Sequence, residues 1–553
     1  MLAWAQGPAQ PEAPSGYAAR PAVAARHFLA VTANPHATDA AVSVLRAGGS
    51  AVDAAIAAQL VLNVVEPQSS GIGGGAFLLH WDATKRQLVA FDGRETAPAA
   101  ATPGRFKGAT FRDVVATGKS IGTPGVVALM AAAHARYGRL PWPRLFEAAI
   151  RLAQSGFPVS PRLHGLLRDD PFLRGDPAAR QLFYHEDGSP LEAGQTLTNP
   201  ALAASLAQIA AAGARAFYRG PLAVDMAAAA RAKGGDLDVA DLVGYQAKER
   251  NPVCGRYRSW KICGMPPPSS GGITVLQLLE LLERVPFENA PPMSADAVHW
   301  FADAGRLAFA DRKRYLGDPD FVPVPQRQLL SPAYLDRRAA LMRAGRSLGI
   351  APPGDLPGRD ALGDDTAPEI PATTHLSIVD AQGNAVAMTS SVEDAFGSRT
   401  LVDGFLLNNQ LTDFSFSQTD DGRPAANRVE AGKRPLSSMA PTMVFDRRGR
   451  LVAVLGSPGG PRIINYVAQT LVAVLDWKMP PEEAIALPHF GSRNGPTEVE
   501  RGPFADRVRP ALKTLGDEVT VDDMTSGLHV IVRRGGRWIG AADPRREGAA
   551  AGD

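Results

Sequence analysis

The sequence contains few of the side chains that bind metals. Its 553 residues include only two cysteines and ten histidines, and the two closest histidines, His27 and His36, are nine positions apart. This spacing excludes the pair of histidines four residues apart on one helix that binds zinc, and two cysteines alone cannot complete a thiolate zinc site. We therefore expect neither a metal nor a cofactor.

The chain also lacks a charge excess of either sign and a long apolar run. The 58 Lys and Arg residues nearly balance the 56 Asp and Glu residues, which gives no electrostatic footprint for nucleic acid or an acidic membrane surface. The best candidate for a membrane span, residues 196–214, is rich in alanine and interrupted by Asn199 and Pro200. We expect a helix of a folded domain there and no membrane span.

The N-terminal residues leave the cellular compartment open. Residues 1–23 contain Ala3-Trp4-Ala5, which is similar to the cleavage site of an export signal, but no basic region or apolar core precedes it. Either the chain begins within an export signal or these residues form a disordered extension. We expect a periplasmic or secreted protein, with a cytoplasmic one as the alternative.

The two cysteines bear on the same question. Cys254 and Cys263 flank a segment expected to form a hairpin that turns at Arg258-Ser259. This register pairs them in a non-hydrogen-bonded position with Cα atoms ~4.5 Å apart, which is within disulfide range. A disulfide and two small residues packed in a sheet both fit this pattern.

Apolar periodicity predicts two helices and then two strands near the N-terminus. Residues 38–65 have helical spacing that is interrupted at Gly48-Gly49, with Ser50 and Asp53 placed as a capping box. A glycine-rich turn at 71–75 follows, with strands expected at 76–81 and 87–92. The turn matches the dinucleotide-binding fingerprint, but it follows a helix and precedes a strand, which is the reverse order. We reject nucleotide binding and expect a turn that needs the backbone freedom of glycine.

An abrupt change of composition precedes Thr373. Residues 349–372 are rich in proline, aspartate and glycine, and we expect a linker that cannot pack. Residues 373–391 then alternate with period two around Gln382-Gly383-Asn384, which predicts a β-hairpin. Cleavage of the Ala372–Thr373 bond would give Thr373 a free α-amine with a pKa of about 7.7–8.0, able to take the proton of its own hydroxyl. By pattern alone, an ordinary strand start also fits.

A second glycine-rich segment, residues 456–460, lies between an expected strand at 451–455 and an expected helix at 463–477. Backbone N–H groups at the beginning of a helix can bind an anion or an oxyanion. An ordinary strand-to-helix turn has the same pattern.

Short motifs occur in a fixed order along nearly the whole chain, at residues 47–55, 70–75, 94–98, 122–125, 266–272, 373–375, 406–415, 433–439 and 456–460. In this order, from about Ala24 to Arg545, the sequence resembles the γ-glutamyltranspeptidase family of N-terminal nucleophile hydrolases. The resemblance implies an α+β fold, a four-layer αββα sandwich with a helix-rich portion in the large chain. It also implies self-cleavage before Thr373 into a large chain, residues 24–372, and a small chain, residues 373–553. These two chains would form one intertwined heterodimer. The sequence does not determine whether two such heterodimers associate further.

The resemblance also assigns catalytic roles. Thr373 would be the nucleophile, and Ser391 would occupy the position of a second family threonine that hydrogen-bonds to it. The backbone N–H groups of Gly459 and Gly460 would form the oxyanion hole, where one donor in other enzymes lowers the barrier by ~3 kcal/mol.

For the substrate, the resemblance implies a γ-glutamyl group held at both ends. Arg94 would bind the α-carboxylate through its planar fork, assisted by Ser437 and Ser438. Gln410 and Asp413 would receive the α-ammonium. By pattern alone, Arg94 is typical of a salt-bridged residue and the others of loops and turns.

Two positions depart from the family. Glu393 stands where the family usually has an asparagine, and this carboxylate could strengthen ammonium binding or repel the substrate carboxylate. It could equally be solvated or pair with Arg399. The segment 416–432, where many members carry a lid, is short and has no tyrosine, and a more open site would admit water and bulkier groups.

The sequence therefore predicts an autoprocessing threonine amidohydrolase. The expected substrates are γ-glutamyl amides such as glutathione and glutamine, and the acyl acceptor is water, an amine or a peptide. The first alternative is an acylase or amidase for a glutaryl-type or other small dicarboxylic amide. The second is an unprocessed binding protein without enzymatic activity.

Overall fold

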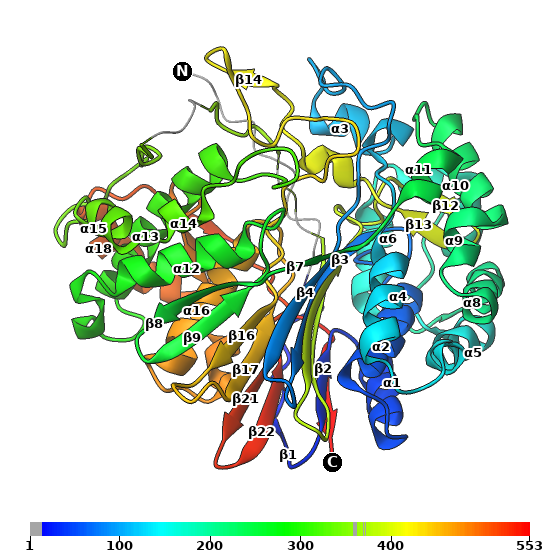
Figure 1. The fold of residues 1–553 in the computed structure, drawn as a ribbon, viewed down its shortest axis with the longest axis horizontal. Coiled ribbons are helices and arrows are strands. Elements are labelled where there is room, and N and C mark those ends of the chain that lie inside the picture. Colours follow the sequence, from blue (N-terminus) through cyan, green and yellow to red (C-terminus); the bar gives the residue numbers. More distant parts are fainter. Residues whose placement is uncertain (1–13, 358–361, 369, 371) are drawn as a thin grey trace.

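Two seven-stranded antiparallel sheets stack face to face in a computed structural model that describes residues 14–357, 362–368, 370 and 372–553 (Figure 1). The first sheet has the order β1 (Val23–Ala25), β22 (Arg537–Ala542), β21 (His529–Arg534), β17 (Leu451–Gly456), β16 (Thr442–Phe445), β9 (Trp260–Gly264) and β8 (Val253–Tyr257). The second has the order β23 (Ala549–Gly552), β2 (Leu29–Thr32), β10 (Thr374–Val379), β11 (Ala385–Ser391), β3 (Gly75–Asp82), β4 (Gln87–Gly93) and β7 (Lys248–Arg250).

Helices cover the outer face of each sheet, so the predicted αββα sandwich is confirmed (Figure 1). The second sheet is covered by α1 (Pro35–Arg46), α2 (Ala51–Val65) and α4 (Val126–Tyr137). The first is covered by α12 (Gly271–Leu282), α16 (Arg462–Leu475) and α17 (Pro481–Ala486), and α13 (Ala295–Tyr315) packs on α12. Every residue of α2 and of α16 is buried, as expected for helices that lie between a sheet and further helices.

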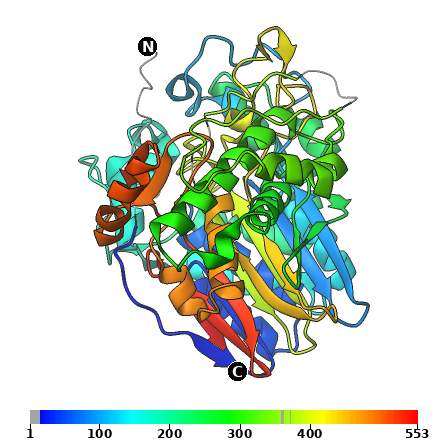
Figure 2. The ribbon, with the colours of Figure 1, turned by 90° about the vertical axis from the view of Figure 1, so that its left-hand side faces the viewer.

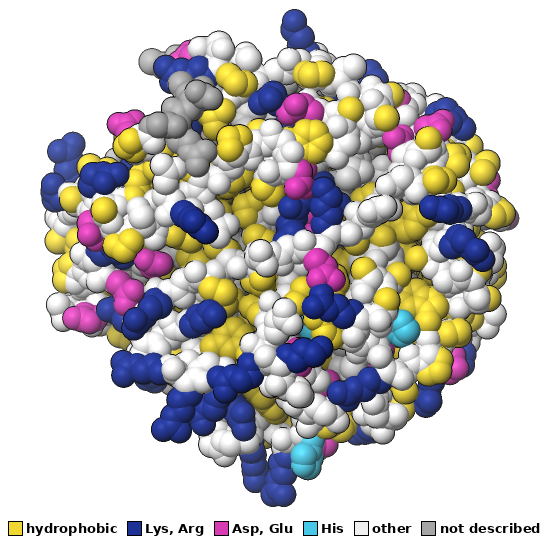
Figure 3. Space-filling view, viewed as in Figure 1, with side chains coloured by type: hydrophobic (Ala, Val, Ile, Leu, Met, Phe, Trp, Pro, Cys, Tyr) yellow, Lys and Arg dark blue, Asp and Glu magenta, His cyan; other side chains and the backbone are white. Residues whose placement is uncertain are grey.

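The remaining helices lie outside these layers, mostly in the helix-rich part of residues 111–244. They are α3 (Phe111–Val114), α5 (Glu147–Ser155), α6 (Pro161–Asp169), α7 (Pro177–Phe183), α8 (Pro200–Ala212), α9 (Arg215–Arg219), α10 (Pro221–Ala232), α11 (Val239–Gly244), α14 (Gln326–Leu329), α15 (Pro332–Ala339) and α18 (Pro503–Thr514). Across the part of the chain that the structure describes, no helix has the length and hydropathy of a membrane span. Figure 3 shows Lys and Arg side chains along the lower edge of one face, with acidic side chains elsewhere on it.

The local predictions near the N-terminus are confirmed. The capping box is present, because Ser50 Oγ accepts from the Asp53 N–H at 3.1 Å and Asp53 Oδ2 accepts from the Ser50 N–H at 2.9 Å. Strands β3 and β4 lie within one residue of the expected ranges.

The glycine-rich turn is explained by close approach and not by backbone freedom, so our expected reason is wrong. Gly73, Gly74 and Gly75 do not have positive φ. A Cβ on Gly73 would lie 2.1 Å from the Leu406 carbonyl oxygen, and one on Gly74 would lie 2.1 Å from the Ser391 carbonyl oxygen. The turn therefore has no room for side chains, because its backbone passes directly against the carbonyl groups of Leu406 and Ser391.

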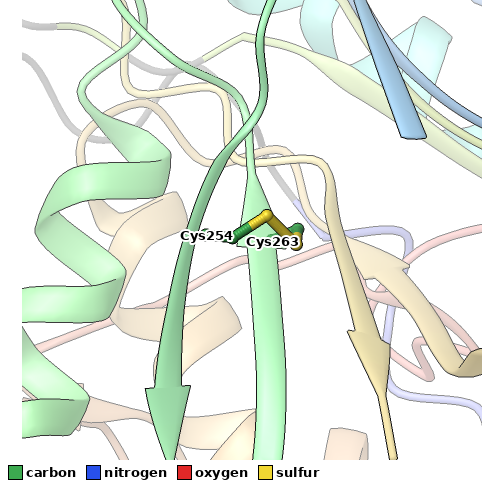
Figure 4. Close-up of a disulfide and its surroundings, with 2 residues drawn as sticks. All are labelled: Cys254 and Cys263. Carbon is green, nitrogen blue, oxygen red and sulfur yellow. A yellow bond between two sulfur atoms is a disulfide. The ribbon is translucent and has the colours of Figure 1, made fainter. Parts of the chain in front are cut away.

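Cys254 and Cys263 form a disulfide (Figure 4). They pair across β8 and β9 in the predicted register, around a turn at Arg258-Ser259, with Cα atoms 4.1 Å apart. The disulfide interpretation of the cysteine pair is therefore confirmed.

Two segments expected to be disordered or unpacked are held against the protein. Ser15 and Ala18 donate backbone hydrogen bonds to the carbonyls of Arg545 and Pro544, at 3.0 and 2.9 Å, and Figure 2 shows this N-terminal segment running along the outside of the molecule. The prediction of a disordered extension is wrong for residues 14–22, while residues 1–13 lie outside the described residues. Composition could not show this, because the contacts are backbone hydrogen bonds to a distant segment.

The same correction applies to the linker 349–372. The Gly354 N–H donates to Asp311 Oδ1 at 2.9 Å, the Asp365 N–H donates to the Lys313 carbonyl at 3.0 Å, and Leu356 is buried. The described part of this linker packs along α13, although it has few apolar side chains, because polar groups make the contacts. Residues 358–361, 369 and 371 of the linker lie outside the described residues.

Candidate active site

Thr373 lies where the linker enters the middle of the second sheet. It directly precedes β10, is 4% exposed, and stands beside the last residue of β11, Ser391. Its Oγ1 donates to Ser391 Oγ at 3.5 Å, and Ser391 Oγ donates to the Ala372 carbonyl oxygen at 2.5 Å. The uncut peptide bond before Thr373 therefore lies beside two hydroxyl groups.

A small cavity of about 40 Å³ opens beside these hydroxyls. It is lined by Arg94, Arg312, Asp365, Ile370, Thr373, Ser391, Glu393, Gln410, Asp413, Leu436, Ser437, Ser438, Met439, Gly460, Pro461 and Ile463. The cavity brings together nine of the eleven predicted site residues, all except Gly459 and Ala372. Asp365 and Ile370, which precede the cleavage site, form part of its wall.

Arg94 and Asp413 form a buried ion pair at the end of the cavity. Arg94 directly follows β4, and its Nη2 lies 2.5 Å from Asp413 Oδ2 and 2.8 Å from the Leu436 carbonyl oxygen. Gln410 Nε2 donates to the same Asp413 oxygen at 2.7 Å. The guanidinium and the carboxylate that we assigned to opposite charges of the substrate are thus next to each other, as binding of one α-carbon with both charges requires.

Ser437 and Ser438 are held by contacts that the sequence did not reveal. Ser438 Oγ accepts from Arg312 Nη2 at 2.9 Å, and Arg312 Nε donates to Ser270 Oγ at 2.8 Å. The Ser437 carbonyl accepts from the N–H and the hydroxyl of Ser270. Sequence reasoning missed Arg312, because an arginine on a helix is typical of a solvated face, and no periodicity shows that residues 297–312 of α13 are all buried.

Gly459 and Gly460 adopt backbone conformations that favour glycine, with φ of +132° and +56°. They lie between β17 and α16, and Gly460 lines the cavity. A Cβ on Gly459 would lie 2.6 Å from Tyr466 Cε2. The turn therefore needs glycine for both conformation and space, and it brings one of the two predicted N–H donors to the cavity.

Glu393 also faces the cavity, in a left-handed conformation with φ of +83°. Its N–H donates to Ser391 Oγ at 2.9 Å, and its Oε2 accepts from Asn409 Nδ2. Two of the interpretations of Glu393 are wrong, since the residue is 3% exposed and Arg399 pairs instead with Asp170 and Asp394. Burial, the Asp413 carboxylate and the Asp394 carboxylate raise the pKa of Glu393 well above its ordinary value.

A further acidic residue, Glu95, lies behind Arg94 and was not predicted. Burial raises its pKa to about 8, although Arg94 Nη1 lies 3.8 Å from Glu95 Oε2 and opposes this shift. No sequence signal identifies this residue, because its burial depends on the close approach of Gly75, whose added Cβ would lie 2.2 Å from Glu95 Oε2.

The segment 416–432 does not line the cavity. It forms two short strands, β14 (Thr419–Asp420) and β15 (Arg423–Pro424), and Phe416 stacks on Phe106 with ring centroids 4.9 Å apart. The short lid expected here therefore packs on residues outside the site.

Comparisons with known proteins agree with this geometry. The sequence profile of the gamma-glutamyltranspeptidase family matches residues 37–553. The glutathione hydrolase proenzyme of Escherichia coli (strain K12) is 37% identical over 543 residues, which cover 95% of this chain and 91% of the relative. The acylase ACY 1 proenzyme of Pseudomonas sp. (strain V22) is 35% identical over 96% of this chain and 94% of the relative. The crystal structure of cephalosporin acylase from Bacillus halodurans has a TM-score of 0.84 and 26% identity, and covers 100% of this chain and 99% of that chain.

The sandwich and its solved structural relatives define an N-terminal nucleophile hydrolase fold. The chain belongs to the γ-glutamyltranspeptidase family. This is a family of enzymes, so the interpretation as a binding protein without enzymatic activity loses its basis.

Proposed function

We propose that Thr373 cuts the chain before itself and then serves as the nucleophile of a γ-glutamyl amidohydrolase. The observation that carries this proposal is the contact between Thr373 Oγ1, Ser391 Oγ and the Ala372 carbonyl oxygen. The three groups are those that an N-to-O acyl shift requires: a nucleophile, a hydrogen-bond donor and a carbonyl.

In the first stage, Thr373 Oγ1 attacks the carbonyl carbon of Ala372. The hydroxyl proton passes to the Thr373 nitrogen as the peptide bond breaks, and an ester forms. The Ser391 hydroxyl already donates to the Ala372 oxygen, so it stabilises the negative charge that develops there. Water then hydrolyses the ester and leaves a free α-amine on Thr373.

In turnover, the new α-amine takes the proton of the Thr373 hydroxyl. The hydroxyl oxygen attacks a side-chain amide of the substrate, and the amine product leaves with the proton. The N–H groups of Gly459 and Gly460 would bind the oxyanion, and Gly460 lines the cavity. Water releases the acyl group from Thr373, and an amine or peptide acceptor can take the place of water.

The charges of the site support a γ-glutamyl donor such as glutathione or glutamine. Arg94 binds the α-carboxylate, with Ser437 and Ser438 beside it, and Asp413 with Gln410 receives the α-ammonium. The relatives named glutathione hydrolase proenzyme favour the same donor.

A related acylase is the second candidate. Relatives named acylase are as similar to this chain as several relatives named glutathione hydrolase, and a glutaryl group would still use Arg94. The Asp413 carboxylate, held by both Arg94 and Gln410, favours a donor with an ammonium group.

We also propose that the two products, residues up to 372 and residues 373–553, remain associated as a heterodimer in a periplasmic or extracellular location. Each product contributes strands to both sheets, and the disulfide fits an oxidising compartment.

The variant Thr373→Ala tests the proposal, with Thr373→Ser as its matched control. Alanine removes the nucleophile, so we expect one uncut chain on a denaturing gel and no release of nitroaniline from a γ-glutamyl anilide. Serine keeps the hydroxyl and the amine, so this variant is cut and active. A Thr373→Ala protein that is cut and active would contradict the assignment.

A further inference from the structure

Glu393 is a buried acidic residue of the cavity that receives its hydrogen bond from a neutral group. Asp413 is matched by Arg94, and Asp394 is matched by Arg399. Within the described residues, no Lys, Arg or His side chain forms an ion pair with Glu393. Its Oε2 receives only a neutral donor, Asn409 Nδ2. A buried carboxyl in this setting is favoured in its protonated form.

The position of Glu393 places this carboxyl at the donor group and not at the bond that is cut. Its backbone N–H is bound to Ser391 Oγ, whereas its side chain reaches Asn409, next to the 3₁₀ helix Gln410–Asp413 that carries the ammonium-binding pair. The backbone at Glu393 is left-handed, with φ of +83°. In this conformation the N–H of Glu393 contacts Ser391, while its side chain contacts Asn409. The carboxyl therefore responds to whatever charge the substrate carries beside Asp413.

We propose that Glu393 makes the choice of acyl donor depend on pH, because its protonated form accepts donors with or without an α-ammonium and its ionised form accepts only those with one. The inference rests on the proposed function. With Glu393 ionised, a glutaryl donor places its carboxylate on Arg94 and leaves Asp413 and Glu393 without a cation. A γ-glutamyl donor brings the ammonium that balances one of these charges.

The groups around Glu393 determine whether its carboxyl is favoured in the protonated or in the ionised form. Burial, Asp413 and Asp394 favour its protonated form, while the Asn409 hydrogen bond and Arg399 favour its ionised form. Arg94, Arg312 and Asp365 also line the cavity, and the cut chain adds the α-amine of Thr373. A bound ammonium adds to the groups that favour ionisation, whereas a glutaryl carboxylate adds to those that oppose it.

The experiment measures kcat/KM for γ-glutamyl p-nitroanilide and for glutaryl p-nitroanilide between about pH 5 and 7, below the range where the donor ammonium loses its proton. Both donors react with the same Thr373 amine. The titration of this amine therefore changes both values equally and cancels in their ratio. We expect the ratio to rise with pH in the wild type, by at most about tenfold per pH unit for one proton. In Glu393→Gln, which keeps the size and cannot ionise, the ratio stays flat.

The matched control is Glu280→Gln in α12. Burial also raises the pKa of Glu280, to about 7, but this residue does not line the cavity, so the variant keeps the wild-type rise. A flat ratio in the wild type overturns the inference, as does a rise that persists in Glu393→Gln, since another group would then be responsible. If Glu393→Gln does not fold, Glu393→Asn takes its place. If neither anilide is hydrolysed, the proposed function fails instead.

Discussion

At the scale of single residues, the site concentrates negative charge around one arginine. Arg94 contacts Asp413 and Glu95, and Glu393 lies beyond Asp413. One guanidinium cannot compensate three carboxylates. Burial raises the pKa of Glu95 and of Glu393 and so favours their protonated forms, while Asp413 forms the ion pair with Arg94.

Glu95 makes the stability of the folded chain depend on pH. Burial raises its pKa from 4.5 to about 8, so the folded state holds a proton that the unfolded chain has lost between these values. The unfolding free energy consequently decreases as pH rises through this window. Glu95→Gln removes this component, and we expect its melting temperature to fall less than that of the wild type between about pH 5 and 8. The exposed Glu186→Gln is the control, and an unchanged slope in Glu95→Gln would contradict the assignment.

At the scale of elements, the site depends on how closely the glycine-rich turn approaches β11. The turn has no side chains where it passes Leu406 and Ser391, and it leads directly into β3, which pairs with β11 along its whole length. This packing fixes the end of β11, and therefore the Ser391 hydroxyl, against Thr373.

The variant Gly74→Ala tests this packing. The added Cβ would lie 2.1 Å from the Ser391 carbonyl oxygen, which is backbone and cannot move alone. We expect a loss of stability of about 1–3 kcal/mol or more, as for other overpacked sites, and slower cleavage before Thr373 as Ser391 shifts.

Gly165→Ala in α6 is the matched control, because no atom lies within 4 Å of its added Cβ. It should keep the stability and cleavage rate of the wild type or gain stability, since alanine favours a helix. The packing argument is wrong if Gly74→Ala melts and is cut like this control. Melting curves and the time course on denaturing gels measure both effects.

The elements that local chemistry specifies could be predicted from the sequence. Ser50 and Asp53 satisfy each other's N–H groups within one turn, and the Cys254–Cys263 register follows from a two-residue turn. The packing of residues 14–22 and of the described part of the linker 349–372 could not be predicted, because it depends on hydrogen bonds to Pro544, Arg545 and α13, far along the chain. Arg312 and Glu95 were missed for the same reason, since only the tertiary fold buries them.

At the scale of the whole molecule, the cleavage site joins two parts that are already interleaved. Strand β10 lies between β2 and β11, and β11 lies between β10 and β3. Cutting the Ala372–Thr373 bond would leave these ladders intact, so we expect the two products to stay together. In this account the uncut chain is a precursor, and cleavage creates the catalytic amine.

The most direct test of this account is the intact mass of the purified protein under denaturing conditions. We predict two masses, the smaller of which corresponds to a chain that begins Thr373-Thr374-His375-Leu376 and ends at Asp553, and co-elution of both chains under native conditions. A single mass for the uncut chain after long incubation, or a fragment that begins at any other residue, would contradict the central claim.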